Sequence, residues 1–475
     1  MKLSKVLFGT KILNEKKLKN VNVLNVAFDT RQNLTGAIFV CLKGEHCDGH
    51  SFMKKAQNLG AVAFIVEEID YDFDGYQLLV EDSRLALANI CKNFYEYDNS
   101  LKVIAVTGTN GKTTTSYMVK SILESAKKKV CLIGTNGVFF GEEKIDLNMT
   151  TPDPTDLFYI LSKAVKKGFE YVVMEVSAHS IYYKKINPIN FAVKALTNIT
   201  QDHLDFFKDM KTYTKTKVDF LKSGNCAKVV NIDTAVGKKL FKKGMLGFGI
   251  KNVSGDLFAS DVSFDFSAYN LNFKNESFKV STNVFGKYNL ENMLCASLIC
   301  KTLGFSNTDI LNGLKNFKSV DGRLNILKNG NKYVVIDFAH TPDALEKIIK
   351  NVSMFCKGNL FCLFGCGGNR DKEKRSKMGY ISTKLCKKVI FTSDNPRFEN
   401  PMEIIKDIAS GTKKKNFEII EQRQLAIKRG VELLKENDFL LVCGKGSENY
   451  IEIMGNKYSY SDFEQVQEFG FVRVN

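Results

Sequence analysis

Short runs of apolar, often β-branched residues alternate with longer amphipathic stretches along almost the whole chain. Runs of this length predict strands buried on both faces, and the stretches between them are long enough for helices. A chain with this alternation folds into α/β domains whose sheets are largely parallel. The predicted strands are residues 37–42, 62–66, 103–107, 130–133, 171–176, 192–196, 229–232, 333–337, 360–364, 388–392 and 439–442, and two of the predicted helices are 112–126 and 342–352.

One segment has a different pattern, because polar and apolar residues alternate with period two from Ser263 to Thr282. This pattern, with a turn near Asn275, predicts an antiparallel hairpin inserted in the middle domain. A polar stretch at 95–102 and turn residues at 319–331 each precede a new strand and mark domain boundaries. We therefore predict three α/β domains, over residues 1–99, 100–323 and 324–475.

Composition narrows the class of protein. The 475 residues suffice for about two to four domains, and 44% hydrophobic with 25% charged residues excludes wholesale disorder. No apolar run reaches the roughly 18 residues that span a bilayer, and lysine returns near the start before a secretory signal could form. The twelve cysteines include no C-x-x-C pair and are expected to be reduced, mostly buried thiols. We expect a cytoplasmic protein.

The excess of positive charge has two possible interpretations. The formal net charge is +16, from 68 Lys and Arg residues against 52 Asp and Glu residues. Such an excess is found in proteins that bind nucleic acid and in proteins that bind small anionic substrates. The lysines are scattered and form no block, which favours a solvated lysine-rich surface over a nucleic-acid stripe. We therefore expect no nucleic-acid partner.

A phosphate-binding loop follows the strand predicted at 103–107. Its backbone N–H groups and a helix N-terminus can surround phosphate oxygens, Lys112 can reach the β- and γ-phosphates, and the Thr113 hydroxyl can ligate Mg²⁺. A turn that only joined a strand to a helix would not need Lys and Thr here, although Val106 stands where the common loop has its first glycine. The predicted nucleotide-binding residues are Gly108, Thr109, Asn110, Gly111, Lys112, Thr113 and Thr114.

Two further polar segments follow predicted strands. Glu175, Ser177 and His179 lie at the end of one strand, and Asp202 and His203 follow the next. Open parallel sheets bind their ligands at the carboxyl ends of strands. Taken alone, Glu175 could be a capping acid and His203 a core histidine. With the phosphate loop, they can form a Mg²⁺ shell of hydroxyl, carboxylate and imidazole.

The order of these motifs resembles that of the Mur ligase superfamily over essentially the whole chain. The other motifs that carry the resemblance are Phe28-Asp-Thr30-Arg31, Gly44-Glu-His-Cys-Asp-Gly49, Thr150-Thr151-Pro152-Asp153, Asp337-Phe-Ala-His340-Thr-Pro-Asp343, Phe364-Gly-Cys-Gly-Gly-Asn-Arg370-Asp371, Asp394-Asn-Pro-Arg397 and Gly444-Lys-Gly-Ser-Glu448. Their joint order is highly specific. The resemblance implies a UDP-binding N-terminal α/β domain, a central ATP-binding domain of the phosphate-loop type with a parallel sheet, and a Rossmann-like C-terminal domain.

The resemblance also implies an ADP-forming ligase. ATP would phosphorylate a substrate carboxylate to an acyl phosphate, and an incoming amine would attack it to give an amide. The form that the chain resembles most adds meso-diaminopimelate to UDP-N-acetylmuramoyl-L-Ala-D-Glu in peptidoglycan precursor synthesis. The resemblance implies ATP and Mg²⁺ as cofactors and small molecules as substrates. We expect no membrane partner and a monomer.

By the same resemblance, Lys217 is carbamylated, which would turn an ammonium that repels Mg²⁺ into an oxygen ligand. Lys215 lies about 160° away around the helix and should face elsewhere. Asn289, Arg323 and Asp337 are added to the ATP site. The implied catalytic residues are Lys112, Glu175, His203 and Lys217, and the implied metal ligands are Thr113, Glu175, His203 and carbamylated Lys217. The implied contacts of the UDP-muramyl peptide are Phe28, Thr30, Glu45, His46, Cys47, Thr150, Thr151, Ser177, Tyr183 and Lys185.

The C-terminal motifs imply the acceptor, since Asp394-Asn-Pro-Arg397 matches the diaminopimelate form. Meso-diaminopimelate carries a second carboxylate that an arginine fork can bind, whereas L-lysine carries none. The implied acceptor contacts are Arg370, Asp394, Asn395, Pro396, Arg397, Gly444 and Glu448.

Four positions depart from the family pattern. Tyr183 and Lys185 stand where Gln and Arg are usual, and Ser447 and Asn449 stand where His and Asp are usual. The alternatives are, in order, an L-lysine-adding form of the same ligase, a folylpolyglutamate synthetase, and a nucleotide-dependent switch protein that forms no amide. The UDP-type domain argues against a folate ligase, and the metal shell with Lys217 against a switch. A basic nucleic-acid-binding ATPase is least favoured.

Overall fold

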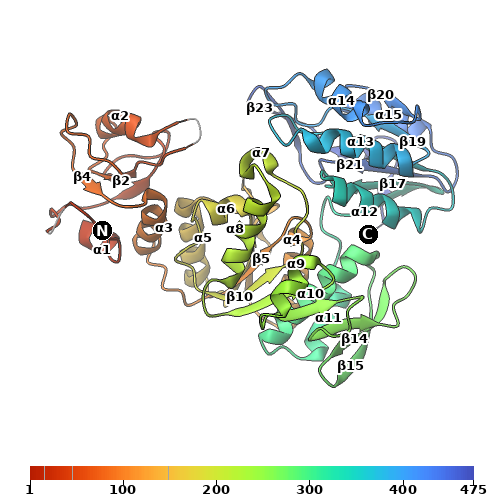
Figure 1. Ribbon diagram of the computed structural model, residues 1–475, viewed down its shortest axis with the longest axis horizontal. Coiled ribbons are helices and arrows are strands. Elements are labelled where there is room, and N and C mark those ends of the chain that lie inside the picture. The colour runs from red at the N-terminus through yellow and green to blue at the C-terminus, as the bar shows by residue number, and fades with distance from the viewer. Residues whose placement is uncertain (15–16, 45–46, 148, 475) are drawn as a thin grey trace. The chain divides into compact units, whose positions relative to one another are not determined.

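The computed structural model describes residues 1–14, 17–44, 47–147 and 149–474. The chain forms two compact units. The first unit comprises Met1–Thr107, Lys127–Lys194 and Thr216–Ala227, and the second comprises Gly108–Ala126, Ala195–Lys215 and Lys228–Asn475. Three large sheets follow one another along the sequence, and the colours of Figure 1 follow the same order.

The N-terminal sheet is parallel throughout, in the order β1-β2-β3-β4. Phe39 of β2 shares a cluster with α2, and its neighbours Ile38 and Val40 share one with α3. Because both faces are buried, these strands are unbroken apolar runs in the sequence. The bounds are β1 (Asn25–Ala27), β2 (Ala37–Val40), β3 (Ala63–Val66), β4 (Gln77–Leu79), α1 (Leu3–Val6), α2 (Met53–Asn58) and α3 (Ser83–Phe94), with a 3₁₀ helix at Gly49–Phe52.

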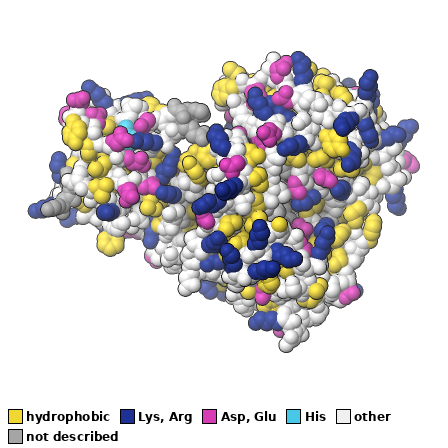
Figure 2. Space-filling view, viewed as in Figure 1, with side chains coloured by type: hydrophobic (Ala, Val, Ile, Leu, Met, Phe, Trp, Pro, Cys, Tyr) yellow, Lys and Arg dark blue, Asp and Glu magenta, His cyan; other side chains and the backbone are white. Residues whose placement is uncertain are grey.

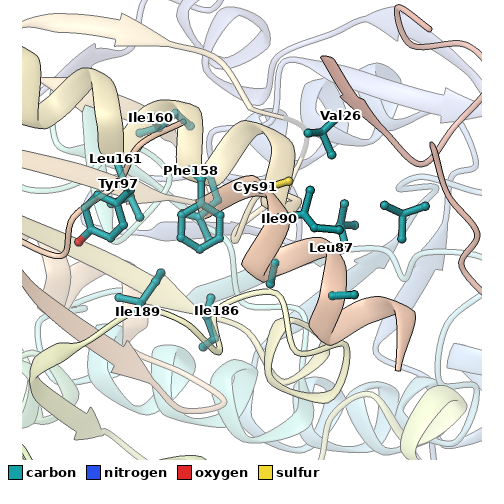
Figure 3. Packing of buried hydrophobic residues seen from close by; sticks show 14 of the residues in the cluster. Val26, Leu87, Ile90, Cys91, Tyr97, Phe158, Ile160, Leu161, Ile186 and Ile189 are labelled. Atoms are coloured by element: carbon teal, nitrogen blue, oxygen red, sulfur yellow. The ribbon is translucent and has the colours of Figure 1, made fainter. Parts of the chain in front are cut away.

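Helix α3 and helix α5 (Pro154–Lys166) belong to one hydrophobic cluster within the first unit. In Figure 3, Leu87 and Ile90 of α3 lie on the side of Val26 from β1. Cys91 lies nearer to Phe158 of α5. Ile90 and Cys91 follow Leu87 by three and four residues, about one helical turn, so the three residues share one apolar face.

The central sheet has the strand order β15-β14-β13-β12-β11-β10-β5-β9-β6-β7-β8. Strands β5, β9 and β6 pair in parallel, whereas β6-β7-β8 and β13-β14-β15 pair antiparallel. The strands are β5 (Lys102–Thr107), β6 (Val130–Gly134), β7 (Gly137–Phe140), β8 (Glu143–Ile145), β9 (Tyr171–Val176), β10 (Phe191–Leu196), β11 (Ala227–Asn231), β12 (Leu246–Gly249), β13 (Leu257–Ser260), β14 (Ala268–Phe273) and β15 (Glu276–Ser281). The remaining helices are α4 (Lys112–Ser125), α6 (Ala178–Tyr182), α7 (Leu204–Phe207), α8 (Met210–Lys222), α9 (Ala235–Phe241), α10 (Lys287–Thr302) and α11 (Asn307–Asn316).

The C-terminal sheet, in the order β20-β19-β18-β21-β17-β16-β24, is Rossmann-like, since β17 to β21 are parallel and helices cover both faces. Val335 and Leu441 pack with α12, α13 and α14, and their neighbours Val334 and Leu440 pack with α15 and α16. The strands are β16 (Asn325–Asn329), β17 (Lys332–Asp337), β18 (Leu360–Phe364), β19 (Lys388–Phe391), β20 (Phe417–Ile419), β21 (Phe439–Cys443), β22 (Tyr450–Ile453), β23 (Asn456–Ser459) and β24 (Val472–Arg473). The helices are α12 (Pro342–Ser353), α13 (Glu373–Leu385), α14 (Pro401–Ser410), α15 (Arg423–Glu432) and α16 (Asp462–Gln467).

Every predicted strand is present, with small displacements of its ends. The predicted hairpin is confirmed as β14 and β15, and it extends the central sheet through β13. Short or partly exposed strands, such as β4, β8 and the β22-β23 hairpin, were not predicted, because they lack a continuous apolar run. The domain limits near residues 99 and 323 stay predictions.

The distribution of charged side chains on the surface agrees with the scattered lysines of the sequence. On the face seen in Figure 2, Lys and Arg side chains are spread widely and lie among Asp and Glu side chains. Most cysteines are buried, as predicted. Among the residues that the structure describes, no helix has both the length and the apolar character needed to cross a membrane.

Candidate active site

The phosphate loop joins β5 to α4 and depends on two glycines. Gly108 and Gly111 have φ angles of +149° and +85°, in the region that favours glycine. A Cβ at Gly108 would lie 2.0 Å from Thr197 Oγ1, and one at Gly111 would lie 2.4 Å from Asn292 Oδ1. Glycine therefore lets the loop lie against its neighbours and lead directly into α4.

Residues that follow β10 hold this loop in place. The N–H of Thr109 donates to the Asn198 carbonyl oxygen at 2.9 Å, and the N–H of Asn110 donates to Asn198 Oδ1 at 3.0 Å. Thr197 Oγ1 donates to the Asn110 carbonyl oxygen at 2.6 Å. The sequence analysis assigned no role to Thr197, Asn198 or Asn292. The feature of the sequence that could have indicated Asn292 is its polar amide within the largely apolar α10 segment.

Lys112 folds back over the loop. Its Nζ donates to the carbonyl oxygens of Gly108 and Thr109, each at 2.9 Å. Next to it, Thr113 is buried, and its Oγ1 accepts a hydrogen bond from Arg323 Nη2 at 3.4 Å. The second unit thus brings Arg323 to the loop that the sequence analysis assigned to nucleotide binding.

Asp337 fixes the backbone around Arg323. Its Oδ2 accepts from the N–H of Leu324 and its Oδ1 from the N–H of Ala339, each at 2.8 Å. The Arg323 guanidinium lies over the Phe338 ring, 4.3 Å from the ring centroid. Burial raises the pKa of Asp337, and Arg323 opposes that rise. Asp337 therefore acts on Arg323 through the backbone as well as through charge.

The remaining predicted ATP residues also lie in the second unit. Thr114 and Asn289 are buried, and Asn289 Nδ2 donates to the Phe285 carbonyl oxygen at 2.8 Å. Asn110 Nδ2 donates to Asp343 Oδ2 at 3.0 Å, in the first turn of α12. Asp343, which the sequence analysis quoted only as part of a motif, is therefore a contact of the loop.

His203 follows β10 and is held by the acid before it. Its Nε2 lies 3.3 Å from Asp202 Oδ2, and its backbone N–H donates to Asp202 Oδ1 at 3.0 Å. Burial raises the pKa of Asp202, but the surrounding cations, His203 first, outweigh burial and hold that pKa well below its usual value. Asp202 therefore stays ionised and fixes the histidine. On α8, Tyr213 Oη lies 3.1 Å from Thr109 Oγ1.

Glu175 lies near the end of β9 in the first unit and is fully buried. Its Oε1 accepts from the N–H of Thr135 at 3.0 Å, and its Oε2 accepts from Thr135 Oγ1 at 3.1 Å. A Cβ at Gly134 would lie 2.1 Å from Glu175 Oε1, so the carboxylate needs glycine there. Thr135 Oγ1 also lies 3.1 Å from Thr150 Oγ1. Thr135, which the sequence analysis missed, therefore links two predicted site residues.

The predicted muramyl-peptide contacts continue from this point. Thr151 Oγ1 donates to the Glu175 carbonyl oxygen at 2.9 Å and accepts from the N–H of Ser177 at 3.0 Å. Lys185 Nζ pairs with Asp153 Oδ1 at 2.6 Å. The first unit therefore groups Thr151 and Ser177 around Glu175, while Lys185 is paired with the acid of the same Thr-Thr-Pro-Asp motif.

The other predicted UDP-muramyl contacts lie elsewhere in the first unit. Tyr183 lies under the guanidinium of Arg84, whose central carbon is 4.1 Å from the ring centroid. Phe28 and Thr30 are half-buried after β1, and Cys47 is exposed. Glu45 and His46 lie outside the described residues.

Lys217 lies on α8 and is 1% exposed, whereas Lys215 on the same helix is exposed. The prediction that these two lysines face different sides is confirmed. Lys217 Nζ donates to Thr107 Oγ1 at 3.5 Å. Thr107, the last residue of β5, donates in turn to the Val176 carbonyl oxygen at 2.8 Å. The amine of Lys217 is therefore directed to the end of the strand that leads into the phosphate loop.

A third group of predicted residues follows β19 and β21. Asn395 Nδ2 donates to Glu448 Oε2 at 2.9 Å, and the fully buried Lys445 donates to Asn395 Oδ1 at 3.0 Å. Lys445 Nζ also lies 3.8 Å from Asp394 Oδ1. Burial raises the pKa of Asp394, but Lys445, Arg423 and Arg397 together outweigh burial, and that pKa falls below its usual value. Lys445 was named above only as part of the motif from Gly444 to Glu448, without a role of its own.

Two predicted arginines flank Gly367. A Cβ at Gly367 would lie 2.8 Å from Arg397 Nη1 and 3.8 Å from Arg370 Cγ. Arg397 Nε donates to Glu452 Oε2, and Arg397 Nη1 donates to the Gly368 carbonyl oxygen, each at 2.9 Å. A guanidinium has five N–H groups, so donors remain for a further acceptor.

Comparison with known proteins identifies the family. Three family models match: "Mur ligase family, catalytic domain" over residues 22–95, "Mur ligase middle domain" over 106–300 and "Mur ligase, glutamate ligase domain" over 322–446. UDP-N-acetylmuramoyl-L-alanyl-D-glutamate--2,6-diaminopimelate ligase 1 of Clostridium acetobutylicum is 39% identical over 457 residues, 94% of each chain.

UDP-N-acetylmuramoyl-L-alanyl-D-glutamate--2,6-diaminopimelate ligase of Clostridioides difficile is 37% identical over 481 residues, which are 98% of this chain and 99% of that protein. A solved structure of a UDP-N-acetylmuramoyl-L-alanyl-D-glutamate--2,6-diaminopimelate ligase superimposes with a TM-score of 0.69 at 26% identity and covers 98% of each chain. The α/β fold of three domains predicted from the sequence is thereby confirmed. The chain belongs to the Mur ligase family of ATP-dependent, ADP-forming ligases.

Proposed function

We propose that this chain joins meso-diaminopimelate to UDP-N-acetylmuramoyl-L-Ala-D-Glu, in the cytoplasmic stage of peptidoglycan precursor synthesis. In the first step an oxygen of the substrate carboxylate attacks the γ-phosphorus of ATP, and ADP leaves. In the second step the amine nitrogen of the acceptor attacks the acyl carbon, loses a proton and displaces phosphate. The full-length similarity to ligases that are named for this reaction supports the proposal.

The chemistry of the loops after β18, β19 and β21 is the observation that carries the choice of acceptor. Arg370 and Arg397 flank Gly367, and the carboxylates of Asp394 and Glu448 lie in the neighbouring motifs. Guanidinium donors together with the buried Asp394 and the half-buried Glu448 suit a ligand end that bears both a carboxylate and an ammonium. The distal end of meso-diaminopimelate bears both groups, whereas that of L-lysine bears only the ammonium.

Phosphate release tests this proposal. The protein is supplied with ATP, Mg²⁺ and UDP-N-acetylmuramoyl-L-Ala-D-Glu, and meso-diaminopimelate is compared with L-lysine as acceptor. Turnover with diaminopimelate and little with lysine supports the proposal. Turnover with lysine alone keeps the ligase and overturns the acceptor. Phosphate release that needs neither acceptor would favour the switch protein, and activity with a folate and glutamate would favour the folate ligase.

Substitution of Arg397 by lysine tests the acceptor contact. We expect the KM for diaminopimelate to rise roughly 10-fold or more, because a bidentate bond to a charged group is worth about 1.5–3 kcal/mol and a lysine cannot form it. The KM for ATP should stay within about twofold, since Arg397 belongs to the acceptor loops. An unchanged KM for diaminopimelate would place carboxylate recognition elsewhere.

We also propose that Thr113, Glu175, His203 and carbamylated Lys217 hold Mg²⁺ during turnover. Among the described residues, no three His, Cys, Asp or Glu side chains form a group that could hold a metal. Mg²⁺ commonly takes one or two carboxylates and completes its shell with water and substrate phosphates, so Glu175 and a carbamate would be enough. The ion would neutralise charge on the transferring phosphoryl group, and Glu175 and Lys217 would supply oxygen ligands.

The other sequence-based assignments are part of the same proposal. They are a division into domains near residues 99 and 323, a monomer that acts on small molecules in the cytoplasm, and the assigned contacts of ATP, UDP-muramyl peptide and acceptor. The hydrogen bonds that Thr150, Thr151 and Ser177 form around Glu175 and Thr135 support a shared role for these residues.

A further inference from the structure

Arg423 is a buried arginine that none of the assigned site residues explains. It begins α15, and its Nε and Nη2 donate to Asp462 Oδ1 and Oδ2 at 2.8 and 2.7 Å. Both side chains are 0% exposed. A buried ion pair is expensive to desolvate and is often no more stabilising than apolar residues of the same size. Fold stability alone is therefore a weak explanation for this pair.

The same guanidinium also contacts two strand ends. Arg423 Nη2 donates to the Cys443 carbonyl oxygen at 2.9 Å, and Nη1 donates to the Ser393 carbonyl oxygen at 3.5 Å. Cys443 directly precedes Gly444, and Ser393 directly precedes Asp394. One rigid group therefore bonds to the residues that directly precede both sets of proposed acceptor contacts.

Asp462 sets the orientation of that group. With two carboxylate oxygens accepting from Nε and Nη2, the plane of the guanidinium is fixed, and in this orientation Nη1 and Nη2 also donate to the carbonyls of Ser393 and Cys443. Asp462 lies at the start of α16, directly after the β22-β23 hairpin. The other end of that hairpin is held by Arg397, whose Nε bonds to Glu452.

We propose that Arg423, oriented by Asp462, is a positioning residue for the acceptor amino acid. It sets the separation between the loop that carries Asp394 to Arg397 and the loop that carries Gly444 to Glu448. This inference rests on the proposed function of those loops. A lysine in place of Arg423 would keep the charge but could not hold both carbonyls and the carboxylate at fixed angles.

The variant Arg423→Lys tests the inference in steady-state kinetics of the full-length enzyme. We expect the KM for diaminopimelate to rise about 10- to 100-fold, because small displacements of positioning groups cost this much, while the KM for ATP and for the UDP-muramyl dipeptide stay within about twofold. Arg429→Lys is the matched control. Arg429 lies on the same helix and forms a fork with Glu418, but it is 40% exposed and its bonds lie away from the two loops.

A second variant keeps the test decisive if Arg423→Lys does not fold. Asp462→Asn keeps the volume and one oxygen acceptor but weakens the hold on the guanidinium, and it should raise the same KM in the same direction. A rise in all three KM values together, or an unchanged KM for diaminopimelate in a folded variant, would overturn the inference. The wild type is measured with both acceptors, so failure of the proposed function shows as turnover with L-lysine alone. In that case, the KM for L-lysine is measured in the Arg423 variant to test the positioning role.

Discussion

Replacing Lys112 with alanine is expected to lower kcat by about 10²- to 10³-fold, the usual cost of losing one preorganised charge-stabilising group. Lys112 is the first residue of α4, and its Nζ bonds to the carbonyl oxygens of Gly108 and Thr109. The ammonium is therefore held by the loop that is to receive the phosphates. Phosphoryl transfer is catalysed mainly by positioning and by cations around the transferring group. Alanine removes the cation and leaves the loop glycines in place.

The measurement is phosphate release, together with direct binding of a nucleotide to the variant. Lys120→Ala is the control, because Lys120 lies on the same helix and pairs with Glu124 at 2.8 Å. We expect that control to stay within about twofold of the wild type, since an i,i+4 ion pair on a helix contributes only about 0.3–0.5 kcal/mol. Near-normal activity of Lys112→Ala would contradict the assignment of this loop as the ATP-binding loop.

The elements that the sequence predicts best are those whose signal is local. The parallel strands β5, β9 and β21 are buried on both faces, so each is an apolar run that needs no knowledge of its partners. The glycine loop before Lys112 is equally local. The same holds for the faces of α8, where a spacing of two residues separates exposed Lys215 from buried Lys217.

Contacts between residues far apart in the chain were not predicted from the sequence. Asn292 meets Gly111, Thr135 meets Glu175, and Lys445 meets Asn395 only because the sheets bring strand ends and helices together. None of these pairs leaves a periodic pattern, since each depends on tertiary contacts between distant segments. The short edge strands are missed for a related reason, because their stability comes from pairing rather than from their own apolar residues.

The pair formed by Arg397 and Glu452 shows how such contacts change an interpretation. From the sequence, Arg397 was expected to meet a carboxylate of the ligand. In the structure a carboxylate of the protein already bonds to its Nε. Glu452 therefore fixes the guanidinium before any ligand arrives, and specificity depends on the donors that remain. Holding a recognition group in place beforehand reduces the entropy lost on binding.

Lys217→Ala is expected to lower turnover by more than about 10²-fold, beyond the usual cost of altering an outer-shell residue of a metal site. The side chain is 1% exposed, and its Nζ bonds to Thr107 Oγ1 at the end of β5. A buried ammonium is costly in this environment, and it would repel a divalent cation at the phosphate loop. Conversion to a carbamate removes both difficulties, because it replaces the positive charge with oxygen atoms that can bind Mg²⁺.

Chemical rescue separates this role from simple packing. Formate or acetate can return an oxygen ligand in place of the lost carbamate, so we expect added acid to restore part of the activity of Lys217→Ala. Lys215→Ala, on the exposed side of the same helix, should be close to the wild type and insensitive to added acid. A cavity in the core would lower stability but would not respond selectively to small carboxylates. Full activity of Lys217→Ala without added acid would contradict the carbamate role.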